Sequence, residues 1–76
     1  MATQGKSLKI GRYFVVLGAE PTPTGTFSPI FGVHEGDTLS GKIVYEQKFS
    51  ADNPTFATEN EAFDAAEDMA IKWIYP

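Results

Sequence analysis

The segment from Phe56 to Ile74 constrains the fold more than any other, because it has the complete pattern of an amphipathic helix. Thr58 is followed three residues later by Glu61, the spacing of a capping box at a helix start. Apolar residues then recur with the period of one helical stripe, at positions 62, 63, 66, 69, 70, 73 and 74. We therefore expect a C-terminal helix with one apolar face and an acidic back.

The residues before this helix have the composition of β-strands. Lys6–Ala19 is dense in β-forming residues and is followed by a loop with two prolines and a glycine. Thr26–His34 and Leu39–Phe49 each show the alternation of a strand, and the turn residues Glu35-Gly36-Asp37 separate them. The sequence thus predicts three strands, connected in order along the chain.

Together these segments predict an α+β fold: a three-stranded antiparallel β-meander with one C-terminal α-helix packed on one face. A chain of 76 residues makes one small domain, residues 1–76, in which we expect residues 1–6 to be a flexible N-terminus. The predicted core consists of Ile10, Phe14, Val16, Phe27, Phe31, Val33, Ile43, Tyr45, Phe49, Phe56, Phe63, Ala66, Met69, Ala70, Trp73 and Ile74.

The composition limits the ways in which so small a core can be reinforced. The chain has no Cys, which excludes a disulfide, and a single His, which disfavours a structural zinc site. Oligomerisation is the remaining route. The polar N-terminal residues and the lack of a long apolar stretch predict a soluble, cytoplasmic protein with no membrane partner.

The charge is uneven along the chain and disfavours nucleic acid as a partner. Residues 1–48 carry five Lys and Arg and four Asp and Glu, whereas residues 49–76 carry one Lys and six Asp and Glu. An acidic surface repels a phosphate backbone. The alternative of a nucleic-acid-binding sheet stays open through its basic residues, Lys9, Arg12, Lys42 and Lys48.

No group of residues has the pattern of a catalytic or metal site. His34 precedes Glu35 and Asp37, but no further ligand or nucleophile is spaced to join them, and the segment is typical of a turn. The sequence also has no glycine-rich phosphate loop and no nucleophile motif. We therefore expect a protein that is not an enzyme and has no catalytic, cofactor or metal residues.

The face of the sheet opposite the helix is the predicted interaction surface, because one helix covers only one face. An apolar patch in a basic frame would favour a protein partner or a homodimer. The residues assigned to this surface are Tyr13, Val15, Ile30, His34, Lys42, Val44 and Lys48. The acidic helix back is an alternative surface, suited to a basic partner.

The sequence resembles two groups of known proteins. The order of three strands and a helix, with a Phe-Ala-Thr-x-x-Glu-Ala entry at Phe56–Ala62 and a Trp-Ile close at Trp73, resembles a set of short, uncharacterised bacterial proteins. More distantly, Tyr13–Val16, Gly25–Phe27 and Thr58–Ala62 resemble HicB-type antitoxins, whose domain is a partial double-stranded-RNA-binding-like fold that binds a toxin. The Pro-Gly-Cys segment of that family is absent. The resemblances imply a fold and, for the second, a protein partner.

Overall fold

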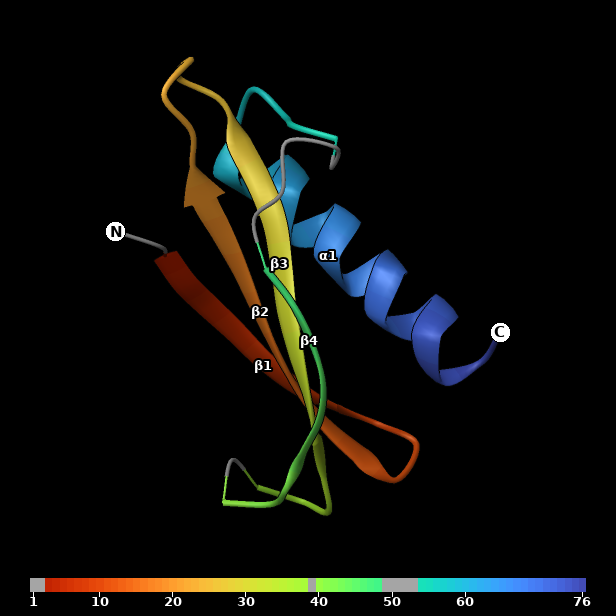
Figure 1. Cartoon of the computed structure of the whole chain (residues 1–76). Helices are drawn as coiled ribbons and strands as arrows, with labels where there is room; N and C mark the ends of the chain where they lie inside the picture. The colour runs from red at the N-terminus through yellow and green to blue at the C-terminus, as the bar shows by residue number, and fades with distance from the viewer. Residues whose placement is uncertain (1–2, 39, 49–53) are drawn as a thin grey trace.

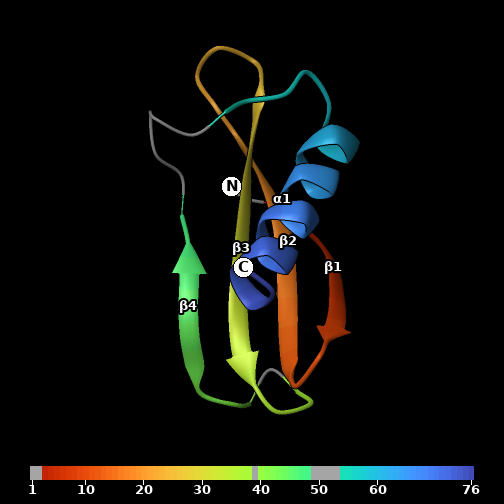
Figure 2. The ribbon, with the colours of Figure 1, turned by 90° about the vertical axis from the view of Figure 1, so that its right-hand side faces the viewer.

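The computed structural model describes residues 3–38, 40–48 and 54–76. It shows an antiparallel sheet of four strands in the order β1-β2-β3-β4, followed by one helix. The strands are β1 (Thr3–Ile10), β2 (Tyr13–Pro21), β3 (Phe27–Glu35) and β4 (Ile43–Gln47), and the helix is α1 (Glu59–Ile74). The helix lies on one face of the sheet, over β3 and β2, and reaches β1 (Figures 1 and 2).

The α+β class, the meander and the C-terminal helix are confirmed, but the prediction of three strands is wrong. Lys6–Ala19 is two strands, because the chain reverses at Gly11-Arg12 and Ile10 pairs with Tyr13. Gly11 has φ of +60° and Arg12 has no positive φ, which fits a two-residue type II′ turn with glycine first. The backbone from Thr3 to Lys6, expected to be flexible, belongs to β1.

The strand predicted at Leu39–Phe49 is shorter and contains a bulge. Strand β4 pairs Tyr45 with Val33 and Ile43 with His34, so Val44 is the extra residue. A bulge reverses the alternation of side chains between its two sides. Ile43, predicted in the core, is therefore 52% exposed, whereas Val44 packs against the core. Leu39 and Phe49, both parts of this predicted strand, lie outside the described residues.

The helix forms as predicted. The hydroxyl of Thr58 accepts from the backbone N–H of Glu61 at 3.2 Å and donates to the Glu61 carboxylate at 3.1 Å. Just before it, Phe56 and Phe27 exchange two backbone hydrogen bonds of 2.7 and 2.8 Å, which fix the entry of the helix against β3. The last turn ends at Tyr75, whose N–H donates to the Ile71 carbonyl.

The core lies between α1 and the sheet. Its buried apolar residues are Val15, Leu17, Ala19, Phe31, Val33, Ala62, Phe63, Ala66 and Ala70. Phe31, Val33, Phe63, Ala66 and Ala70 were predicted. Among the residues packed around them are Ile10, Phe27, Tyr45, Phe56, Met69 and Ile74, also predicted. Trp73 is 37% exposed at the edge of this layer.

The prediction that Phe14 and Val16 face the helix is wrong by one residue. Val15 and Leu17 are fully buried and belong to the core cluster under α1. The reason is the unrecognised hairpin: β1 has Leu8 and Ile10 on one face, and these pair with Val15 and Tyr13. Because cross-strand partners share a face, the apolar face of β1 sets the phase of β2.

Candidate functional site

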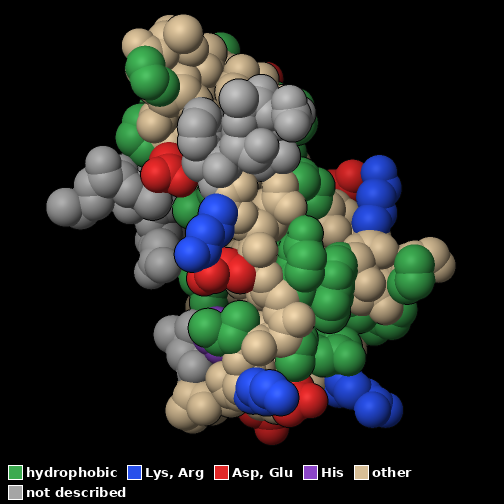
Figure 3. Space-filling model, in the orientation of Figure 1, with side chains coloured by type: hydrophobic (Ala, Val, Ile, Leu, Met, Phe, Trp, Pro, Cys, Tyr) green, Lys and Arg blue, Asp and Glu red, His purple; other side chains and the backbone are tan. Residues whose placement is uncertain are grey.

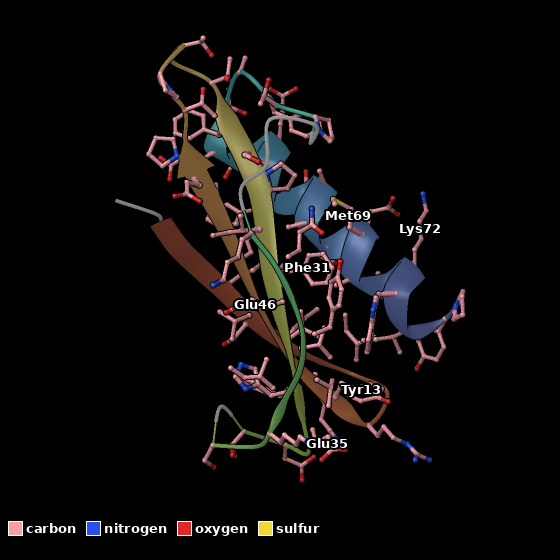
Figure 4. All side chains as sticks on the ribbon, viewed as in Figure 1. Tyr13, Phe31, Glu35, Glu46, Met69 and Lys72 are labelled. Carbon is pink, nitrogen blue, oxygen red and sulfur yellow. The ribbon has the colours of Figure 1, made fainter. Side chains whose placement is uncertain are left out.

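The sheet has one face against α1 and one face that no described helix or strand covers. Figure 4 shows Tyr13 and Phe31 on the side of the sheet where α1 lies, and Glu46 on the opposite side. We call the second side the open face. Its residues, by pairing and alternation, include Ser7, Lys9, Phe14, Val16, Gly18, Ile30, Gly32, His34, Ile43, Glu46 and Lys48.

A hollow of about 470 Å³ lies in the open face, over β2, β3 and β4. Four of its lining residues form a block on two neighbouring strands: Val16 pairs with Gly32, and Gly18 pairs with Ile30. Each apolar side chain therefore has a glycine beside it across the ladder and another two residues away along its own strand. Gly32 is partly exposed and contributes open space to the hollow, whereas Gly18 is buried at its wall.

Gly32 is not required by its backbone conformation or by crowding within the monomer. It has no left-handed φ, and among the described residues a Cβ placed there would meet only Nε2 of His34, at 3.9 Å, an ordinary contact. Glycine in a strand interior weakens the strand and often marks a place where another group approaches closely. Gly32 therefore leaves space in the open face that neither its backbone conformation nor its described neighbours require.

The edges of the hollow carry charges of both signs. Lys48 and Glu46 point to the same side of β4, with Nζ and Oε1 3.4 Å apart, and both are exposed. At the far edge of the sheet, Lys9 forms an ion pair with Asp37, at 2.5 Å between Nζ and Oδ1. The frame of the open face is thus mixed in charge and not basic.

The four basic residues that favoured nucleic acid do not form one patch. Lys9 and Lys48 lie at opposite edges of the sheet, each beside a carboxylate. Arg12 is in the β1–β2 turn and Lys42 precedes β4. Figure 3 likewise shows Lys and Arg side chains in separate places on the visible face, several of them beside Asp or Glu. This arrangement gives little continuous attraction for a phosphate backbone.

His34 is buried at the end of the open face that leads into the β3–β4 connection. Its side chain contacts the backbone of that connection. Its Nδ1 lies 3.2 Å from the carbonyl oxygen of Gly41, so a proton on Nδ1 would be donated to that carbonyl. Only 9% of the residue is exposed. No group of three or more His, Cys, Asp or Glu that could hold a metal occurs in the described part of the chain.

The residues predicted for the interaction surface divide between the two faces. Ile30, His34 and Lys48 line the hollow. The hollow is not lined by Tyr13, Val15 and Val44, because these residues pack on the helix side of the sheet. Their predicted place on the open face is wrong. Lys42 is exposed just outside β4 and does not line the hollow.

Sequence reasoning missed Val16, Gly18, Gly32 and Ile43 at this site. A signal was present in the sequence: Val16 and Ile30 are each followed two residues later by a glycine within a strand-like run. Interior glycines of this kind suggest close approach of another group. That signal becomes useful only once the register of β2 against β3 brings the two pairs together.

The helix offers a second and less structured surface. Asp64, Glu67, Asp68 and Ile71 line a shallow depression of about 260 Å³ on the outer side of α1. Asp68 forms an exposed i, i+4 ion pair with Lys72, at 3.0 Å. This arrangement is typical of the solvated side of an amphipathic helix.

The comparisons with known proteins add no assignment. None of the described helices has the length and apolar character needed to cross a membrane. No protein-family model matches the chain, and neither the curated proteins nor the solved structures give a significant match. Among the described residues, the hollow in the open face is the feature best suited to bind another molecule.

Proposed function

We propose that this chain is a non-catalytic protein-interaction module that docks a protein partner on its open face. The observation that carries the proposal is the hollow that Val16, Ile30 and the glycines Gly18 and Gly32 line on two paired strands. A contiguous apolar patch on the surface of a small domain commonly marks an interaction site. The balanced charge of the frame favours a protein over a polyanion.

The shape of the hollow suits side chains of a partner. An apolar side chain that enters it loses its contact with water, which contributes about 1.5–3 kcal/mol for a residue such as Val or Leu. Specific interfaces place such anchors at the centre and polar residues at the rim. Val16 and Ile30 occupy the centre here, and Glu46 and Lys48 occupy the rim.

Site-specific photo-crosslinking tests the proposal. A photoreactive phenylalanine analogue is placed at Val16 on the open face and, as a matched control, at Asp64 on the exposed side of α1. We expect protein adducts from position 16 that position 64 does not give. Equal adducts from both positions, or none from position 16, would overturn the proposal.

A second variant shows whether an adduct depends on docking. Ile30 is half-buried and lies outside the core cluster, so Ile30→Asp should leave the fold intact. It should abolish the adducts from position 16, because a carboxylate in the hollow loses its hydration without a partner charge. An adduct that nuclease removes would instead support the nucleic-acid alternative and contradict the protein partner.

A further inference from the structure

We propose that the partner is a second copy of this chain, packed open face to open face about a two-fold axis that runs across the strands. This inference rests on the proposed function and names its partner. The two-fold operation places β2 against β2 and β3 against β3 of the second copy, in the aligned packing of two sheets about 10 Å apart.

The central block of the open face is complementary to itself under this operation. Val16 and Gly18 occupy two successive open-face positions of β2, and Gly32 and Ile30 occupy the two paired positions of β3. An axis between the two rows exchanges them. Val16 then lies over Gly18 of the second copy, and Ile30 lies over Gly32. Each Ile30 enters the space left by Gly32 of the other copy, and each Val16 packs on the surface above the buried Gly18, so four apolar side chains are buried in the interface.

The rim charges fit the same operation. Glu46 lies in the row of Val16 and Gly32, because it pairs with Gly32. Lys48 follows the last residue of β4, two residues beyond Glu46, and the alternation of the strand places it level with Ile30. The exchange of rows therefore places Glu46 of each copy opposite Lys48 of the other, which gives two symmetric ion pairs. A second copy thus satisfies both the shape and the charge of this face, whereas an unrelated partner would need to reproduce both.

The size of the face is adequate for a dimer. Four strands about 4.8 Å apart and up to nine residues long span roughly 500 Å² in projection. Side-chain relief raises the accessible area toward the roughly 800 Å² per partner of a specific interface. A small domain also gains from such burial, because its own core covers a limited share of its surface.

Sedimentation equilibrium on the purified chain is the first measurement. We expect the mass to rise from 8.3 kDa toward twice that value as the concentration increases. Gly32→Ala is the decisive variant, because a Cβ fits the monomer but fills the hole that receives Ile30. It should weaken self-association about tenfold or more while the monomer melts at the same temperature or higher. Asp64→Ala, on the outer side of α1, should leave self-association unchanged.

Exchange of the rim charges tests the two-fold geometry itself. Glu46→Lys gives a face with two lysines and Lys48→Glu a face with two glutamates, so each variant alone should dimerise more weakly than the wild type. A mixture of the two should form heterodimers that regain the lost affinity, because every contact is again between opposite charges. A mixture that associates no better than either variant alone would contradict the proposed packing.

The outcomes separate this inference from the proposed function. A wild-type mass that stays at 8.3 kDa at every concentration overturns the dimer. Crosslinks from position 16 to a different protein would then still support the open face as a docking surface. Self-association that Gly32→Ala and the charge variants leave unchanged would place any dimer on another face and would also overturn the inference.

Discussion

The rings of Trp73 and Tyr45 stack with their centroids 5.1 Å apart and 26° between their planes. Trp73 is in the last turn of α1 and Tyr45 is in the edge strand β4. The ring of Tyr13 meets the same indole in a T-shaped arrangement with the centroids 6.0 Å apart, and the Phe31 ring centroid lies 5.5 Å from that of Tyr45. Figure 3 shows hydrophobic side chains gathered between β4 and the C-terminal half of α1. This cluster ties the end of the helix to β4, over which its backbone does not lie.

Trp73→Ala should therefore destabilise the fold although the residue is partly exposed. We expect a loss of about 2–4 kcal/mol in the free energy of unfolding, from lost burial and from the lost aromatic pairs. Thermal or urea unfolding measures it. Lys72→Ala is the neighbouring control and should change stability by less than about 0.5 kcal/mol, because its ion pair is exposed. Equal stabilities of the two variants would contradict the role of this cluster.

The phase of β2 predicts opposite results for two adjacent residues. Leu17 is fully buried under α1, so Leu17→Ala should cost about 2–5 kcal/mol. Val16 lies on the open face, so Val16→Ala should cost about 1 kcal/mol or less. Urea unfolding at low protein concentration measures both in the monomer. The reverse order of stabilities would restore the strand phase that the sequence alone suggested.

Loss of the Thr58 hydroxyl should weaken the start of α1. Thr58→Ala removes the acceptor for the Glu61 N–H and should cost about 1 kcal/mol. Thr58→Ser keeps the hydroxyl and should retain most of that stability. Thr55→Ala, at an exposed position before the cap, serves as the control. Circular dichroism melts of the three variants give the comparison, and a Thr58→Ala melt that matches the control would rule out the cap.

Gly41 should tolerate substitution less well than Gly36. A Cβ there would collide with the backbone oxygen of Glu35, so Gly41→Ala must move the β3–β4 connection. We expect a cost of about 2 kcal/mol or more. Gly36→Ala has open space but a φ of +88° and should cost about 1 kcal/mol. Chemical denaturation measures the loss of stability in both variants. A larger loss for Gly36→Ala than for Gly41→Ala would contradict the close approach of Gly41 to the Glu35 backbone.

The helix could be predicted from the sequence because its determinants are local. Thr58 and Glu61 are three residues apart, and the stripe from Ala62 to Ile74 needs only the geometry of one helix to be recognised. The alternation of Thr26–His34 placed Phe31 and Val33 in the core for the same reason. The existence of one uncovered sheet face also followed, because one helix cannot cover two faces.

The composition of that face was decided only by the tertiary structure. Tyr13–Leu17 is a continuous run of apolar residues. Its sequence alone does not show which of the two alternating sets of side chains faces the helix. The Gly11-Arg12 turn and the polar alternation of β1 set that choice through cross-strand pairing. The bulge at Val44 likewise places the side chain of Ile43 on the opposite face from the one predicted.

The sequence by itself therefore determined the class of the fold, its helix and the presence of an open face. The tertiary structure alone decided which residues meet there and brought Gly18 and Gly32 from two strands into one hollow. The physical reason is that helix patterns depend on neighbours a few residues apart. A sheet face depends on the register between strands, and a shift of one residue moves every side chain to the other side.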